Sequence, residues 1–103
     1  MTQLIFKAQE ADNHNYKILG YINLGNLYNY YGLYDEALKY ELIALNMCEK
    51  FGVDVHLNSI YNNIGIIYSQ NQAPQNAQEY FLKALAISRE QGEKGRIGLN
   101  LIN

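Results

Sequence analysis

One polar residue type recurs at a fixed interval along this chain, and it carries the most useful chemistry in the sequence. Asn23, Asn63 and Asn103 follow one another at a spacing of 40 residues. An amide side chain offers both a donor and an acceptor, so it can pair with the backbone of an extended peptide almost regardless of that peptide's sequence. The spacing therefore predicts a row of peptide-binding amides.

Other amides and several apolar side chains flank this row. The predicted peptide-binding residues are Asn23, Asn26, Asn62, Asn63, Ile22, Ile66, Tyr30 and Asn103. Apolar residues between amides would form pockets for alternate side chains of a partner. Two alternatives stay open: the amides bond to a neighbouring helix or reflect an Asn-rich composition, and Ile22 is buried by helical packing.

Catalytic, cofactor-binding and metal-binding residues are not predicted. His14 and His56 have no partner at metal-ligand spacing, which favours solvent-exposed histidines in loops. Cys48 has no adjacent base and is expected to be a small packing residue. Gly92-x-x-Gly95 lacks the strand and the spacing of a phosphate-binding loop. The sequence therefore predicts a protein that is not an enzyme and needs no cofactor.

Charge and hydropathy narrow the class of partner. The chain has 103 residues and a formal net charge of -2, and its eight Lys and Arg residues are scattered, which disfavours nucleic acid. No apolar run approaches the roughly 18 residues of a membrane span, and the first residues lack a signal-peptide pattern. We expect a cytoplasmic protein whose partner is a protein or peptide, with no membrane contact from this segment.

Helical periodicity identifies the elements that must position these residues. Apolar residues recur three or four apart over 18–31, 34–51, 57–68 and 74–91, without strand-like alternation, and predict an all-α fold. Asp35 or its neighbour is expected to cap the second helix, and Pro74 fits the first turn of the fourth. Gly52 and Gly92 are expected at left-handed C-terminal caps.

The 40-residue interval extends far beyond asparagine. The residues that recur are Tyr21, Gly25, Tyr28, Ala37, Tyr40, Leu42, Ala44, Leu45 and Gly52, which return as Tyr61, Gly65, Tyr68, Ala77, Tyr80, Leu82, Ala84, Leu85 and Gly92. Such self-similarity is typical of stacked helical repeats, whose small residues mark close helix contacts. We therefore expect Gly25 to face Ala37.

Two positions depart from the repeat. Glu41 stands where the second repeat has Phe81, so either Tyr40 fills that space or Glu41 is partly shielded there. Gln72 stands where the first repeat has Gly32, so the turn at 71–73 is expected to need a conformation other than that of glycine.

The motifs Tyr21-x-x-Leu-Gly-x-x-Tyr28 and Tyr61-x-x-Ile-Gly-x-x-Tyr68, each followed by Ala and Ala-Leu, resemble tetratricopeptide repeats of a long, 40-residue type. The resemblance implies a right-handed α-solenoid of antiparallel helix pairs, a protein-binding function, and first helices that line the concave face. It also implies that the recurring Asn contacts bound peptides. Asn26 and Asn63 match the amide sites of the family's carboxylate clamp, but Ile22 stands where a clamp lysine is expected, which disfavours a receptor for chaperone tails.

The repeat register divides the single domain, residues 1–103, into four parts. It predicts the end of a preceding repeat at 1–12, full repeats at 14–52 and 54–92, and the start of a third repeat at 96–103. Apolar residues at both ends (Leu4, Ile5, Phe6, Ile97, Leu99, Leu101 and Ile102) could support head-to-tail self-association. A sensor or regulatory segment of a larger bacterial signalling protein is the other alternative to a peptide-binding module.

Overall fold

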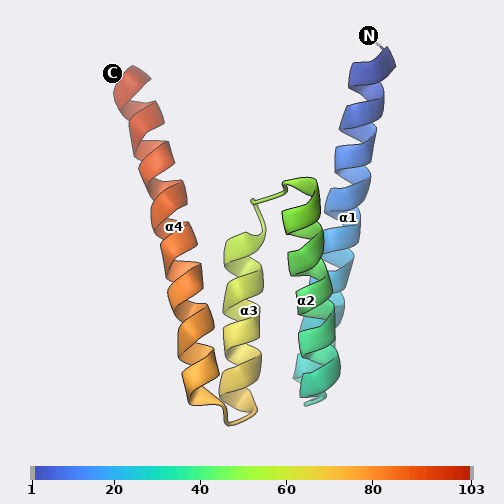
Figure 1. Cartoon of the computed structure of the whole chain (residues 1–103), viewed down its shortest axis with the longest axis vertical. Helices are drawn as coiled ribbons and strands as arrows, with labels where there is room; N and C mark the ends of the chain where they lie inside the picture. Colours follow the sequence, from blue (N-terminus) through green and yellow to red (C-terminus); the bar gives the residue numbers. More distant parts are fainter. Residues whose placement is uncertain (1, 103) are drawn as a thin grey trace. The chain divides into compact units, whose positions relative to one another are not determined.

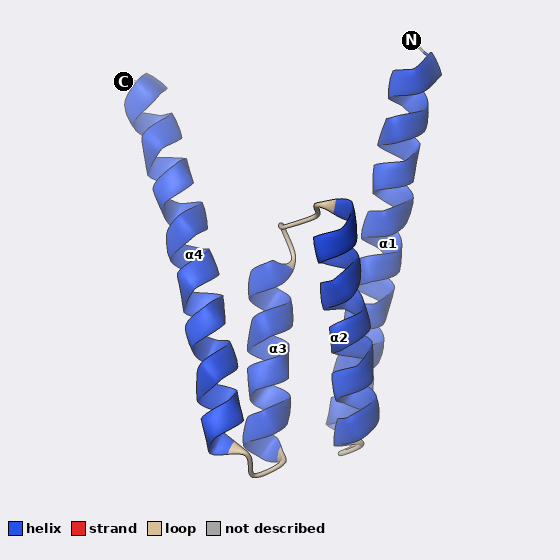
Figure 2. Ribbon diagram, in the orientation of Figure 1, coloured by secondary structure: helices blue, strands red, loops and turns tan. Residues whose placement is uncertain are grey.

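The computed structural model describes the backbone of residues 2–102 and the side chains of residues 13–92. Four helices follow one another: α1 (Thr2–Tyr30), α2 (Tyr34–Phe51), α3 (Leu57–Gln70) and α4 (Pro74–Ile102). Figure 1 shows this order, and Figure 2 shows helices joined by short loops, with no strand in the described backbone. The prediction of an all-α fold is confirmed.

The helices form two compact units, Met1–His56 and Leu57–Asn103. In the first unit α1 packs against α2, and in the second α3 packs against α4 (Figure 1). Each unit is therefore one helical hairpin, as expected of helices joined by three-residue loops. The buried apolar side chains are Ile18, Ile22, Ala37, Ala44 and Cys48 in the first unit, and Ile60, Ile64, Ile67, Ala77 and Ala84 in the second.

The first and the last helix are longer than the repeat register suggests. α1 continues without interruption through residues 12–14, and α4 continues through residues 92–96. No helix end therefore marks the predicted boundaries of the partial repeats. The apolar side chains proposed for head-to-tail association, from Leu4 to Phe6 and from Ile97 to Ile102, lie outside the described side chains, and Asn103 also lies outside the described residues.

Both hairpin turns share one hydrogen-bond pattern. The backbone N–H of Leu33 donates to the carbonyl of Tyr28 at 2.9 Å, and that of Ala73 donates to the carbonyl of Tyr68 at 2.8 Å. The residue before each donor is left-handed, with φ 75° at Gly32 and φ 62° at Gln72. The expectation for the second turn was wrong: Gln72 adopts the glycine-like conformation, because the same turn hydrogen bonds must form.

The helix ends confirm two predictions and correct two others. Gly52 is a left-handed cap with φ 67° and ψ 30°, and Pro74 begins α4, both as predicted. Gly92 is not a cap, because it lies within α4 and has no positive φ. Asp35 does not cap α2: the N-cap is Leu33, which makes no side-chain cap bond, and Asp35 lies in the first turn, where a carboxylate favours the helix dipole.

The closest helix contact differs from the expected one by a turn. A Cβ added to Gly25 would lie 2.6–2.9 Å from side-chain atoms of Glu41, so Gly25 faces Glu41 and not Ala37. A Cβ added to Gly65 would likewise lie 2.7–3.0 Å from the ring of Phe81. Glu41 therefore fills the space of Phe81 in the first unit, and its side chain is fully buried, which decides between the two alternatives for this position.

Candidate functional site

The predicted amides lie on α1 and α3, the first helix of each unit. On α1 the side chains of Asn23 and Asn26 are exposed, and on α3 those of Asn62 and Asn63 are partly exposed. Asn23 and Asn63 hold the same position in the two units because each lies two residues before the glycine that contacts the second helix. The closest helix contact of each hairpin therefore fixes the position of Asn23 in the first unit and of Asn63 in the second.

Asn62 belongs to a polar network inside the second unit. Its Nδ2 donates to Asn58 Oδ1 at 3.1 Å. Asn58 Nδ2 in turn donates to the backbone carbonyl of Ala84 at 2.9 Å and to the hydroxyl of Ser88. The network joins α3 to α4 and fixes the orientation of both amides. Sequence reasoning missed Asn58, although its spacing of four residues from Asn62 places the two on one helix face.

The remaining predicted site residues differ widely in exposure. Ile22 is buried, with 6% of its surface exposed, while Ile66 is 40% exposed and Tyr30 is 83% exposed. The ring of Tyr30 meets that of Tyr31 edge to face, with centroids 5.3 Å apart. Ile66 and Tyr30 are accessible side chains on α3 and α1, and Ile22 is a packing residue in this structure.

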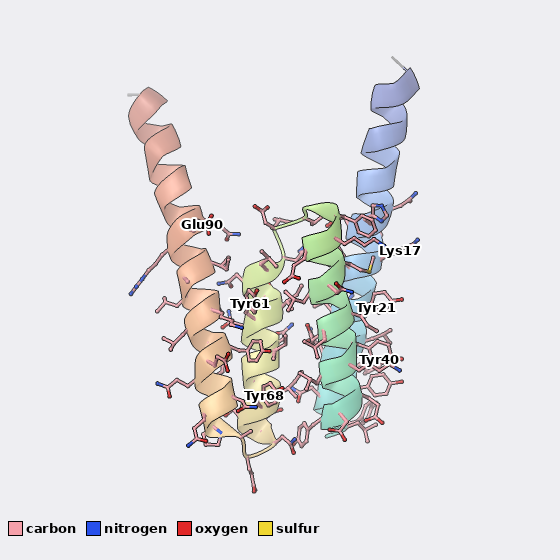
Figure 3. All side chains as sticks on the ribbon, viewed as in Figure 1. Lys17, Tyr21, Tyr40, Tyr61, Tyr68 and Glu90 are labelled. Atoms are coloured by element: carbon pink, nitrogen blue, oxygen red, sulfur yellow. The ribbon has the colours of Figure 1, made fainter. Side chains whose placement is uncertain are left out.

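Each unit also contains a group of three tyrosines that sequence reasoning did not identify. In the first unit the ring of Tyr40 stacks with Tyr21 at 6.1 Å and with Tyr28 at 5.3 Å. In the second unit Tyr80 lies 6.2 Å from Tyr61 and 5.7 Å from Tyr68. Figure 3 shows Tyr21 on α1 beside Tyr40 on α2, and Tyr61 and Tyr68 together on α3. Recurrence of all three positions at one interval was the available signal.

Lysines accompany the tyrosines in both units, but their environments differ. Lys39 Nζ lies 5.8 Å from the centroid of Tyr40. Lys83 Nζ lies 4.8 Å from the centroid of Tyr80 and 3.7 Å from a carboxylate oxygen of Glu79. A cation over a ring face is favourable. In the second unit that cation is also paired with an acid one helix turn away.

The prediction of solvent-exposed loop histidines was wrong for His14, which lies in a helix, whereas His56 lies in the loop before α3 and is partly exposed. His14 lies within α1, and its ring stacks on Phe51 with centroids 3.6 Å apart and planes at 10°. His56 precedes α3, and its Nε2 is 2.5 Å from Asn15 Oδ1. Both imidazoles therefore help to close the end of the first hairpin. Among the described residues no group of His, Cys, Asp and Glu could hold a metal ion.

Cys48 is a buried packing residue. Only 2% of its surface is exposed, and burial raises the pKa of its thiol, with further increases from the carboxylates of Glu49 and Asp54. A raised pKa lowers the thiolate fraction, and the thiolate is the nucleophilic form. The side chain is therefore protected twice, by its burial and by its protonation.

Comparison with known proteins gives one match. Residues 59–90 match the family model described as tetratricopeptide repeat. No curated protein and no solved structure matches the chain. None of the helices, within the residues that the structure describes, has the length and apolarity that crossing a membrane requires. The matched segment covers most of α3 and the part of α4 that packs against it, including the Gly65–Phe81 contact and the second tyrosine group. Residues 59–90 are therefore similar to a tetratricopeptide repeat, and this match supports the assignment of the chain to that family.

Proposed function

We propose that this chain is a non-enzymatic interaction module that binds an extended segment of a partner protein through amides on α1 and α3. Tetratricopeptide repeats are helical repeats, which function chiefly by presenting a surface to other proteins. The proposal assigns that role to the amides Asn23, Asn26, Asn62 and Asn63, with Ile66 and Tyr30 beside them.

One observation carries the proposal. Asn23 and Asn63 occupy the same position in two hairpins, and both retain solvent access. An amide repeated at one position of successive repeats can follow the backbone of an extended peptide, because that backbone also repeats its donors and acceptors. Asn26 is exposed one turn further along α1, which extends the polar surface.

The network around Asn62 supports a preorganised surface. Since Asn62 is held by Asn58, and Asn58 by the carbonyl of Ala84, less side-chain freedom is lost when a ligand binds. The Asn62 side-chain oxygen remains an acceptor, because the bond to Asn58 uses only the Nδ2 donor of Asn62. We expect this residue to accept a backbone N–H from the peptide.

The experiment begins with peptides selected from a randomised display library on the intact chain. The double variant Asn23→Ala with Asn63→Ala is expected to bind the selected peptides about tenfold more weakly or worse, because two hydrogen bonds to the peptide backbone are lost. The control is Asn46→Ala with Asn76→Ala, which removes two exposed asparagines from the second helices α2 and α4. Circular dichroism confirms that both variants stay helical.

Equal binding by the two double variants would exclude the amide site. A second measurement addresses the mode of recognition: replacing single peptide bonds of a selected ligand by esters removes one N–H each. Weakening at alternate positions is the expected result for backbone recognition. Loss of binding only on side-chain substitution would contradict it.

A protein partner is also favoured over nucleic acid by the net charge of -2, because binding to phosphates needs a concentrated basic surface. Head-to-tail self-association is the competing proposal. Light scattering over a concentration series separates the two: growth of the mass with concentration supports self-association, and a constant monomer mass excludes it.

A further inference from the structure

A hollow of about 370 Å³ lies beside α1. The described residues that line it are Lys17, Gly20, Tyr21 and Leu24, whose spacing of three and four residues places them on one face of the helix. Asn26 follows Leu24 by two residues and therefore points to the opposite side of α1. Asn23 follows Gly20 by three residues and lies at the edge of this face, but it does not line the hollow.

Gly20 and two apolar groups create this hollow. A Cβ added to Gly20 would meet no atom within 4 Å, so the position is open space. Leu24 is 38% exposed beside it, and Tyr21 presents a ring whose stacking on Tyr40 fixes its orientation. The floor is therefore apolar and rigid, which suits a single aliphatic side chain of a ligand.

One side chain that lines the hollow is cationic. Lys17 lines it, and Lys39 sits over Tyr40, the ring that stacks on Tyr21. Lys83 pairs with Glu79 in the second unit, whereas no ion pair joins Lys17 or Lys39 to a described acidic side chain, although Asp35 and Glu36 lie one turn before Lys39 on α2. Lys17 is thus the ammonium group that lines the hollow without an ion pair to the described part of the chain.

The corresponding positions of the second unit lack this character. Lys17 is replaced by Leu57, and Lys39 is replaced by Glu79, which pairs with Lys83. The second tyrosine group therefore carries a neutralised cation, whereas the first carries two lysines and an adjoining hollow. The first unit thus combines a hollow with a lysine that has no described ion pair, which suits an anionic ligand.

We propose that the hollow beside Tyr21 binds an acidic peptide segment in which an aliphatic side chain adjoins a carboxylate. The aliphatic group occupies the space left by Gly20 and packs on Tyr21 and Leu24. The carboxylate pairs with Lys17, and a second acidic residue of the peptide meets Lys39. This binding surface does not depend on the amide site and can be occupied together with it.

The test uses three acetylated, amidated peptides: Gly-Ser-Asp-Leu-Glu-Ser-Gly, the same peptide with Asn and Gln for the acids, and the same peptide with Ala for Leu. Titrations are followed by NMR on the intact chain. The acidic leucine peptide is expected to shift the resonances of Tyr21 and Leu24 and to bind roughly tenfold more tightly than the neutral one at low salt, with the difference reduced at high salt. The alanine peptide is expected to bind more weakly than the leucine peptide.

Two variants and two controls locate the site. Lys17→Gln is expected to abolish most of the preference for the acidic peptide. Gly20→Leu fills the hollow and is expected to lower the affinity for the acidic and the neutral leucine peptides by the same factor. Lys83→Gln in the second unit and the double variant Asn23→Ala with Asn63→Ala are expected to leave this binding unchanged. A result that excludes the amide site therefore does not exclude binding at the hollow, and the two proposals are tested separately.

Several results would overturn the proposal. Equal affinity for acidic and neutral peptides would remove the role of the lysines, and full binding by Gly20→Leu would remove that of the hollow. Concentration-dependent shifts of Tyr21 without peptide, together with a dimer mass in sedimentation, would show that a second copy covers this face instead.

Discussion

The two hairpins share a tyrosine framework and a turn but differ in what is packed beneath them. Tyr21, Tyr28 and Tyr40 are matched by Tyr61, Tyr68 and Tyr80, and the centroid distances agree within half an ångström: 6.1 and 5.3 Å in the first unit, 6.2 and 5.7 Å in the second. The tyrosine groups and the turns therefore determine how the helices pair in both units, and the residues that differ give each unit its own properties.

The contact at the helix crossing shows how far the specialisation extends. Gly25 faces the buried Glu41, whereas Gly65 faces Phe81, which is 38% exposed. A carboxylate and an aromatic ring differ in their chemistry. What they share here is that each packs against a glycine, which has no Cβ. The repeat therefore requires the space that glycine leaves and does not require a particular chemistry opposite it.

A second difference involves two positions that change together. The first unit has Ile18 and Cys48, both buried, where the second has Asn58 and Ser88, which are joined by a hydrogen bond. An apolar pair in one hairpin is thus a polar pair in the other. Exchanging one member alone would leave an amide without its partner, and the first prediction tests this coupling.

We expect the largest effect from Ile18→Asn. This fully buried side chain would be replaced by an amide with no hydroxyl at position 48, and the loss of unfolding free energy should be about 3 kcal/mol. Adding Cys48→Ser should restore part of the loss, because the second unit shows the bonded pair. Urea unfolding of the two variants measures this coupling, and equal stabilities would refute it.

Gly25→Ala should have the next largest effect. The new Cβ would lie 2.6 Å from Glu41 Oε1, and overpacking of this kind costs about 2 kcal/mol. Gly65→Ala should cost less, because the partly exposed ring of Phe81 can move toward solvent. Gly20→Ala is the matched control on α1: with nothing within 4 Å, it should stabilise the helix by up to about 1 kcal/mol.

The comparison also tests the reactivity of position 48 and its counterpart. Burial raises the pKa of the Cys48 thiol, so the thiolate fraction at a given pH is reduced and alkylation in the folded protein should be slow. Ser88→Cys in a Cys48→Ala background places a thiol at an exposed position, which should react roughly tenfold faster or more. Iodoacetamide labelling followed by mass spectrometry gives both rates, and similar rates would contradict the burial of Cys48.

The smallest expected effect is at the turns. Gln72 has a φ of 62°, a region that costs a side-chain-bearing residue about 1 kcal/mol, so Gln72→Gly should raise the midpoint of thermal unfolding. Gly32→Gln, the reverse exchange in the first unit, should lower stability by a similar amount. If the two exchanges shift stability in the same direction, the turns are not equivalent.

Periodicity and helix-end residues were sufficient to predict the all-α fold, the helix pairing, the cap at Gly52 and the start of a helix at Pro74. It could not predict that Gly25 faces Glu41, because a burial preference argues against a carboxylate at a helix crossing. It missed the glycine-like turn at Gln72, since there the hydrogen bonds of the turn outweigh residue preference. Gly92 was assigned as a cap from its equivalence to Gly52, but the helix continues through it.

For the candidate site, the sequence identified which amides recur but could not tell which are already bonded. The Asn58–Ser88 contact joins residues 30 positions apart, and only packing of α3 on α4 brings them together. The tyrosine groups were missed for a similar reason. The recurrence of each tyrosine is visible in the sequence, but stacking depends on the rotation of one helix relative to its partner.

The paired tyrosine groups give the molecule an optical property of its own. The chain has ten tyrosines and no tryptophan, so its near-ultraviolet circular dichroism arises mainly from tyrosine. Rings held in fixed stacks couple strongly, and the coupling disappears when side-chain packing is lost, even if the helices persist. Replacing Tyr40 or Tyr80 by Leu would remove the ring stacking of one tyrosine group at a time, so that the change in the spectrum would report on the packing of that hairpin during unfolding or ligand binding without an added label.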